Sequence, residues 1–150
     1  MPETILIVDD ETDILELLEL IITDKTGYRV LTTGDPQEVL EIIRKEKPDL
    51  LITDLRMPEV DGLELVAEAL KIDPQLPFVV ITAYGTCELA LEALEKGVFD
   101  FITKPFRQEQ ILLTIDKAMK WRRVLKENLT LQAEILALKK QIQEYAARDL

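Results

Sequence analysis

The sequence predicts an α/β domain that is built on a doubly wound parallel sheet of five strands, in the order 2-1-3-4-5, with an extended helix at its carboxyl end. One observation predicts the sheet. Short apolar runs alternate with segments of helical periodicity over about the first hundred residues, and this alternation is typical of a parallel sheet covered by helices on both faces. A further observation predicts the long helix: all seven prolines and all five glycines lie at or before Pro105.

Five runs rich in apolar residues are expected to form the strands. They are Thr4–Val8, Tyr28–Thr33, Asp49–Thr53, Phe78–Thr82 and Phe99–Thr103. The first, third and fourth runs are almost continuously apolar, as is typical of strands that are buried on both faces of a sheet. The whole chain is 47% hydrophobic, which is enough apolar material for such a core.

Apolar stripes at helical spacing predict four helices between these runs. The stripes are Ile14–Ile21, Val39–Ile43, Leu63–Leu70 and Leu89–Leu94. Asp35 followed by Pro36 is typical of a helix start, since aspartate caps the first turn and proline fits the first helical position. Gly27, Gly34 and Gly97 fall where elements are expected to end.

The length of 150 residues fits one domain with an extension, so we expect a globular domain at 1–120 and a linker helix at 121–150. The sequence shows no pattern of a signal peptide or of a membrane span. Cys87 is the only cysteine, so no internal disulfide can form. These features favour a cytoplasmic location.

The charge of the chain is distributed unevenly. The net charge is −11, but residues 1–106 hold 23 acidic and 9 basic residues, whereas residues 107–150 hold 6 and 9. The acidic part should repel nucleic acid, and the basic residues of the long helix are expected to form a solvated face rather than a DNA-binding surface. The chain has no histidine, which excludes histidine-based catalysis, most zinc sites and a phosphohistidine of its own.

Polar residues gather where the predicted strands end. Asp9 and Asp10 follow the first run and Asp54 follows the third, whereas Thr82 ends the fourth and Lys104 follows the fifth. Open parallel sheets bind ligands at the carboxyl ends of their strands, and the first and third strands are neighbours, so three carboxylates should share one crevice. Mg²⁺ would relieve their repulsion, and the lysine and the hydroxyl would donate to a phosphoryl group. This combination indicates transfer of phosphate to a carboxylate.

Each of these residues also has a simpler interpretation. A lone Asp-Asp pair is most often a solvated turn or a helix cap, and a lone Lys104 is most often a surface charge. Thr82 alone is an ordinary strand end, and Asp54 alone can cap the loop that follows it. Only their occurrence at successive strand ends, in order, favours a shared site.

Four segments resemble the receiver domains of two-component response regulators. They are Asp9-Asp10-Glu11, Asp54-Leu-Arg-Met-Pro58, Thr82-Ala-Tyr-Gly85 and Phe101-Ile-Thr-Lys104-Pro105. The last two segments most resemble the NtrC-type branch, whose members are sigma-54-dependent transcription activators. The resemblance covers residues 1–120 and implies a flavodoxin-like architecture and a sensor histidine kinase as partner. It also implies AAA+ ATPase and DNA-binding domains, neither of which lies within these 150 residues.

The resemblance implies which residues form the metal site. Asp54 would be the phosphoacceptor. Mg²⁺ would be held by Asp9, Asp10, Asp54 and the backbone carbonyl of Arg56.

The resemblance also implies which residues respond to phosphorylation. Lys104 and Thr82 would contact the phosphoryl oxygens, and Phe101 would be an aromatic switch that moves into space vacated by Thr82. Pro105 would follow a cis peptide bond. Arg56 and Tyr84 occupy positions that would tune the lifetime of the phosphoryl group. Phenylalanine in place of the commoner tyrosine would leave the switch dependent on packing.

The long helix carries a heptad pattern. Large side chains recur at alternating steps of three and four from Trp121 to Tyr145, along a seam formed by Val124, Asn128, Leu131, Ile135, Leu138 and Ile142. Isoleucine at one seam position and leucine at the other, with a single asparagine, favours a parallel two-stranded coiled coil, so we expect a homodimer. The alternative is an amphipathic helix that folds back on its own domain.

Three other functions fit parts of the sequence. A standalone receiver or phosphotransfer module would have no need of the helical extension. A Mg²⁺-dependent phosphohydrolase usually has an Asp-x-Asp spacing where this chain has adjacent Asp9 and Asp10. A flavin-binding module shares the architecture, but acidic strand ends would repel a flavin phosphate.

Overall fold

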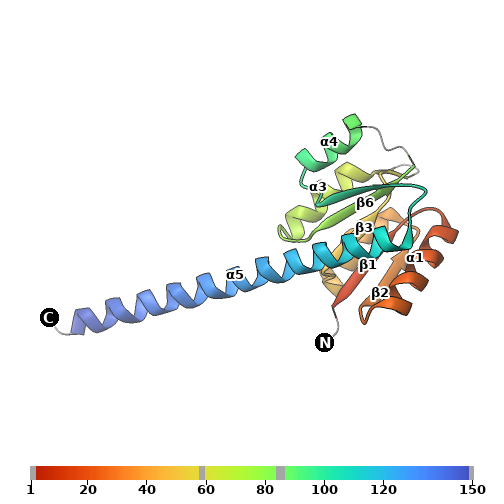
Figure 1. Cartoon of the computed structure of the whole chain (residues 1–150). Coiled ribbons are helices and arrows are strands. Elements are labelled where there is room, and N and C mark those ends of the chain that lie inside the picture. Colours follow the sequence, from red (N-terminus) through yellow and green to blue (C-terminus); the bar gives the residue numbers. More distant parts are fainter. Residues whose placement is uncertain (1–2, 58–59, 84–86, 149–150) are drawn as a thin grey trace.

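The computed structural model describes residues 3–57, 60–83 and 87–148. Its main sheet has five parallel strands in the order β2-β1-β3-β6-β7 (Figure 1). They are β1 (Thr4–Val8), β2 (Arg29–Thr33), β3 (Leu50–Thr53), β6 (Phe78–Thr82) and β7 (Asp100–Thr103). The predicted order 2-1-3-4-5 is confirmed, because the short strands β4 (Arg56–Met57) and β5 (Val60–Asp61) form a separate antiparallel pair.

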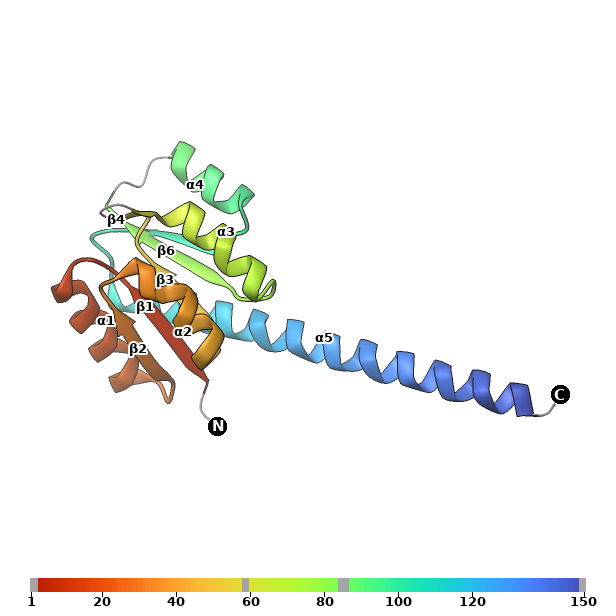
Figure 2. The ribbon, with the colours of Figure 1, turned by 180° about the vertical axis from the view of Figure 1, so that it is seen from behind.

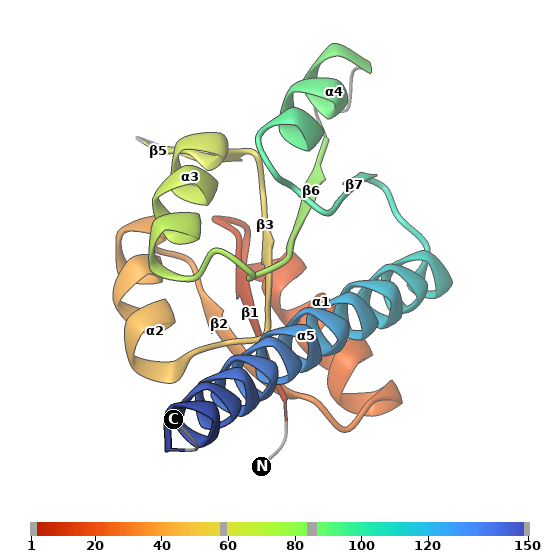
Figure 3. The same ribbon diagram turned by 90° about the vertical axis from the view of Figure 1, so that its left-hand side faces the viewer.

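Helices cover both faces of the sheet. The helices of the described residues are α1 (Thr12–Lys25), η1 (Pro36–Glu38), α2 (Val39–Glu46), α3 (Gly62–Ile72), α4 (Cys87–Glu95) and α5 (Gln108–Arg148). α1 and α5 lie on one face, and α2 and α3 lie on the other (Figure 3). The short helix η1 begins where the sequence predicts a cap: the Asp35 carboxylate accepts a hydrogen bond from the Gln37 N–H at 2.9 Å.

The core has two layers, one on each side of the sheet. Ile5 and Ile7 of β1 face α1 and α5, whereas Leu6 and Val8 face α2 and α3, because successive side chains of a strand point to opposite faces. All four side chains are at most 1% exposed. Burial of one such side chain contributes roughly 1.5–3 kcal/mol, which explains why this strand must be apolar throughout.

α5 is one continuous helix that extends far beyond the sheet. Its 41 residues span about 60 Å at 1.5 Å per residue. Ile111, Ile115 and Met119 are buried against the sheet, but the described residues from 126 to 147 are exposed, and Figures 1 and 2 show this part projecting away from the domain. The helix therefore does not fold back on its own domain. None of the described helices has the length and apolar character needed to cross a membrane.

Ion pairs tie α5 to the amino-terminal edge of the sheet at the point where it leaves the domain. Arg122 donates two hydrogen bonds to the Asp73 carboxylate, at 2.7 and 3.3 Å. Lys126 donates one to the Asp49 carboxylate at 2.6 Å. We refer to the residues that make these contacts and one further pair as the basal clamp: Glu3, Asp49, Asp73, Arg122, Arg123 and Lys126.

The basal clamp corrects the expectation that the basic residues of the long helix form a solvated face. Arg122 is only 6% exposed, because it lies between the helix and the domain. Arg123 keeps about half of its side chain in solvent, and it donates hydrogen bonds to Glu3 and to the Tyr28 hydroxyl. Part of the positive charge of α5 is therefore paired with carboxylates of the same chain.

Candidate functional site

The polar residues predicted at the strand ends lie together in the structure. Asp9 and Asp10 follow β1, Asp54 follows β3, Thr82 ends β6 and Lys104 follows β7. The strands are parallel and adjacent, so their carboxyl ends meet at one edge of the sheet. The Asp54 N–H donates to the Val8 carbonyl at 3.2 Å, which holds the two acidic strand ends in register.

Lys104 joins two of the carboxylates. Its Nζ donates to Asp54 Oδ2 at 3.0 Å and to Asp9 Oδ2 at 3.1 Å, and it lies 3.9 Å from Glu11 Oε1. Asp9 is 2% exposed and Asp54 is 6% exposed, so these contacts are largely shielded from water. Shielding strengthens an ion pair and makes an unpaired charge unfavourable.

The three aspartates form a cluster that suits a divalent cation. Asp9, Asp10 and Asp54 each offer a carboxylate oxygen, and these atoms lie within 4.8 Å of one another. Asp10 is exposed, so one side of the cluster is open to solvent. A donor set made of carboxylate oxygens matches the preference of Mg²⁺, which usually keeps several waters.

The pKa values of this cluster follow from burial and pairing. Burial raises the pKa of Asp9, and it outweighs the hydrogen bond from the Glu11 N–H and the pairing with Lys104. Burial alone would lower the pKa of Lys104, but its hydrogen bonds to Asp54 and Asp9, together with their charges, raise it. Pairing therefore favours the charged form of Lys104, whereas burial makes ionisation of Asp9 less favourable than that of an exposed aspartate.

Two of the remaining predicted residues, Thr82 and Pro105, lie next to Lys104. Thr82 is fully buried, and its carbonyl accepts a hydrogen bond from the Lys104 N–H at 2.8 Å. The bond between Lys104 and Pro105 is cis, the form that the resemblance implies. Phe101 is half-buried and packs against the core layer of α2 and α3. Arg56 belongs to β4, and Tyr84 lies outside the described residues.

Gly62 is a structural requirement of the site that sequence reasoning did not single out. A Cβ at this position would lie 2.7 Å from the Asp54 carbonyl oxygen, 2.8 Å from the Leu55 carbonyl oxygen and 2.9 Å from Leu55 Cα. The Gly62 N–H donates to the Leu55 carbonyl at 2.9 Å, so the backbone of α3 touches the backbone that follows Asp54. A glycine at the start of a helix, where it is not favoured, is the one available sequence signal.

Gly62→Ala is expected to lower the free energy of unfolding by about 1–3 kcal/mol, because the added methyl group meets backbone atoms that cannot turn aside. Urea unfolding measures this. Gly27→Ala is the matched control, since a Cβ at Gly27 would meet nothing within 4 Å. Equal destabilisation by the two variants would show that the close approach at Gly62 is unimportant.

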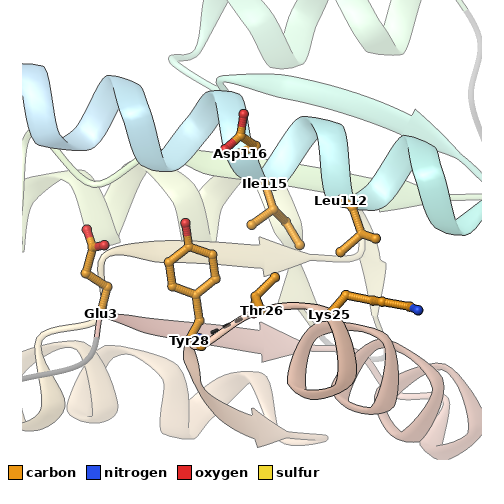
Figure 4. A pocket seen from close by; sticks show the side chains of 8 residues that line it. Glu3, Lys25, Thr26, Tyr28, Leu112, Ile115 and Asp116 are labelled. Atoms are coloured by element: carbon orange, nitrogen blue, oxygen red, sulfur yellow. Dashed lines mark hydrogen bonds between the residues drawn. The ribbon is translucent and has the colours of Figure 1, made fainter.

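A pocket at the opposite edge of the sheet has no comparable chemistry. It has a volume of about 580 Å³ and lies between the turn that follows α1 and the helix α5 (Figure 4). Glu3, Lys25 and Asp116 contribute charges of both signs around Tyr28 and Ile115.

Comparison with known proteins agrees with the fold. Residues 5–116 match the family described as the response regulator receiver domain. The chain is 42% identical over 118 residues to the transcriptional regulatory protein GlrR of Escherichia coli K12, covering 79% of this chain and 26% of GlrR. It is 37% identical over 123 residues to the chemotaxis protein CheY of Thermotoga maritima, covering 80% of this chain and 100% of CheY. The crystal structure of NtrX from Brucella abortus aligns with a TM-score of 0.80 at 34% identity, covering 87% of this chain and 30% of that one.

The fold and the aspartate cluster define a class of small α/β signalling domains with an acidic pocket at the carboxyl ends of the strands. Within this class, the chain belongs to the response regulator receiver domain family, because the match spans most of its length. Domains of this family bind Mg²⁺ through their acidic pocket, and here Asp9, Asp10 and Asp54 form it. The chain spans about a quarter of the length of the transcriptional regulators that it matches first.

Proposed function

We propose that Asp54 accepts a phosphoryl group from a sensor histidine kinase. The observation that carries this proposal is the position of the Asp54 carboxylate, which is buried in the aspartate cluster and held at 3.0 Å by Lys104. A carboxylate oxygen would bond to phosphorus while the bond from phosphorus to the donor nitrogen breaks. Lys104 would then pair with the phosphoryl oxygens, which carry more negative charge than the carboxylate alone.

Asp9, Asp10, Asp54 and the backbone carbonyl of Arg56 would hold Mg²⁺ in this proposal. The close spacing of the three carboxylates supports the assignment. The bound ion would neutralise charge on the phosphoryl oxygens during transfer. The ion pair between Lys104 and Asp9 would weaken as the metal takes over the carboxylate.

Thr82 and Phe101 would transmit the effect of phosphorylation from Asp54 to the packing of the domain. The Thr82 carbonyl accepts a hydrogen bond from the Lys104 N–H, so the threonine lies next to the lysine that contacts Asp54, and in this proposal its hydroxyl would turn toward a phosphoryl group there. Phe101 is only half-buried, which leaves its ring room to move when the threonine turns. A charge of about −1.5 to −2 added at Asp54 would bias this two-state packing.

The extension of α5 would couple the domain to an output. Its seam side chains are exposed along the described helix, and large apolar surfaces of this kind mark interaction sites. We expect residues 121–150 to form a parallel two-stranded coiled coil with a second copy, and 1–120 to act as the receiver. Sedimentation equilibrium tests this, and a monomer at every concentration would contradict it.

The output would be a sigma-54-dependent transcription activator in a longer protein. The match to GlrR supports the proposal, because its name describes a transcriptional regulatory protein and the match covers only 26% of its length. Its AAA+ and DNA-binding domains would act on DNA, whereas the acidic receiver itself would not bind nucleic acid. A cytoplasmic location fits this role.

The experiment that tests phosphoryl transfer is labelling of the whole chain by acetyl phosphate. We expect labelling to require Mg²⁺ and to stop on its removal by a chelator. Asp10→Asn should raise the Mg²⁺ concentration needed by roughly 10–100-fold, because it replaces a charged carboxylate ligand with a neutral amide. Asp13→Asn, an exposed aspartate in the first turn of α1, is the control and should leave the requirement unchanged. Labelling without Mg²⁺ would overturn the metal assignment.

A standalone receiver is the second candidate, and the match over the full length of CheY favours it. It predicts that removal of the α5 extension leaves partner binding unchanged. A phosphohydrolase would instead turn over a phosphomonoester.

A further inference from the structure

We propose that the dimer interface does not end with the coiled coil but extends onto the receiver domain, where a groove beside Trp121 accepts residues 121–124 of the partner copy. This inference rests on the proposed dimer and adds a second contact surface to it. The groove, called here the Trp121 groove, is formed mainly by Leu70, Pro74, Gln75, Phe99, Trp121 and Leu125.

The Trp121 groove is uncharged and large enough for a side chain. Its volume is about 350 Å³, and it lies between α5, the connection from α3 to β6 and the connection from α4 to β7. Figure 3 shows the α3–β6 connection passing close to α5. None of the residues that line the groove carries a charge. Because the surface is uncharged, a second copy can cover it without burying an unpaired charge.

The groove is continuous with the seam of α5. Trp121 forms one wall of the groove and is also the first residue of the heptad pattern, and it is 49% exposed. The next seam residue, Val124, is also 49% exposed, and the apolar side chains continue to Ile142, which is 67% exposed. A second copy that covers the seam therefore reaches the groove without a break.

The parallel arrangement decides which part of the partner lies at the groove. In a parallel coil in register, Trp121 of each copy lies at the same height as Trp121 of the other. Seam positions normally hold aliphatic side chains, and two indole rings need more space than one such layer offers. The groove supplies that space. An antiparallel coil would instead place the Tyr145 end of the partner there.

The basal clamp holds the groove in shape before the partner arrives. Arg122, next to Trp121, is bound to Asp73 at 2.7 Å. Asp73 also accepts a hydrogen bond from the Gln75 N–H at 3.1 Å, so the clamp fixes both α5 and the opposite rim at Pro74 and Gln75. A preformed surface loses little conformational entropy on binding, which favours its use as an interface.

The test uses Trp121 as a reporter, since it is the only tryptophan of the chain. Sedimentation equilibrium gives the dimer dissociation constant, and acrylamide quenching of fluorescence gives the exposure of the indole ring at the same concentrations. Ile135→Asp supplies the monomer reference, because it places a charge in the seam and leaves the groove intact. We expect quenching to fall severalfold when the unmodified chain dimerises.

Gln75→Arg separates the groove from the coil, since it puts a cation at the rim and leaves the seam unchanged. We expect it to weaken dimerisation about tenfold, as loss of a desolvated contact does. Gln37→Arg is the matched control: both glutamines donate their backbone N–H to an aspartate two residues earlier, but Gln37 lies on η1, away from the groove.

The outcomes distinguish this inference from the proposed dimer. A dimer in which Trp121 is quenched as in Ile135→Asp would overturn the groove and leave the coil standing. A dimer of Gln75→Arg that is as tight as the dimer of Gln37→Arg would also overturn the groove. The covering of the indole ring would then be due to the coiled coil alone. A chain that stays monomeric in sedimentation would overturn the proposed dimer and the groove together.

Discussion

Asp54→Asn is expected to take no phosphoryl group from acetyl phosphate, while the domain keeps its fold. An amide oxygen is not a nucleophile for phosphorus, but it can still accept the hydrogen bond that Lys104 donates to Asp54 at 3.0 Å. The free energy of unfolding should therefore change by less than about 1.5 kcal/mol, the size of one hydrogen bond. Labelling with and without Mg²⁺ measures the first effect, and urea unfolding measures the second.

Asp49→Asn is the matched control for this variant. Asp49 is also buried and also bound to a lysine, but it lies at the opposite edge of the sheet. The Asp49→Asn variant should be labelled at the same rate as the unmodified chain. Labelling of Asp54→Asn at that same rate, on another carboxylate, would show that the acceptor has been assigned wrongly.

Arg122→Ala is expected to produce the largest loss of stability. It removes a side chain that is 7% exposed and deprives Asp73 of the two hydrogen bonds that Arg122 donates. Breaking a buried pair from one side destabilises by roughly 3–5 kcal/mol, and we expect the lower end because the Asp73 side chain is 29% exposed. Urea unfolding followed by circular dichroism measures the difference.

Arg123→Ala is the control for Arg122→Ala, since it removes the neighbouring arginine of the same clamp. The Arg123 side chain is 47% exposed, and solvent screens its pair with Glu3, so its effect should be several times smaller. Similar losses from the two variants would mean that the burial of Arg122 does not matter.

The dependence of stability on pH gives a separate check that the buried carboxylates of the basal clamp stabilise the domain. Burial alone would raise the pKa of Asp49, but its hydrogen bonds from Lys126 and the Thr4 N–H, with the charges of Lys126 and Arg122, lower that pKa below 3.8. A carboxyl group whose pKa is lowered by folding stabilises the domain fully above its unfolded pKa and loses this effect as the pH falls through the folded value. The stabilisation from Asp49 should therefore be constant near neutrality and disappear below pH 3.8.

α5 is the element that connects the aspartate cluster to the proposed dimer. It begins at Gln108, four residues after Lys104, and it passes through the basal clamp before it leaves the domain. A movement of Lys104 toward a phosphoryl group would therefore act on the first turn of a helix that is held rigidly at its exit. This short connection supports a coupling between Asp54 and the seam.

Several features follow from local patterns and were predictable. The strands β1 and β6 have the predicted bounds, and β2, β3 and β7 begin one residue later than predicted. The aspartate cluster follows from one rule, that parallel strands bring their carboxyl ends to one edge. The end of the prolines and glycines at Pro105 predicted the unbroken helix from Gln108.

The sequence by itself determined the sheet, the long helix and the residues that gather in the aspartate cluster, because each depends on periodicity or on position relative to a strand. Only the tertiary structure decided the contact of Gly62 with the backbone of Asp54, the basal clamp and the Trp121 groove. Arg122 and Asp73 are 49 residues apart, and each taken alone looks like an ordinary solvated charge. Their pairing is fixed by the angle at which α5 crosses the sheet, and that angle results from packing of the whole core rather than from any local pattern.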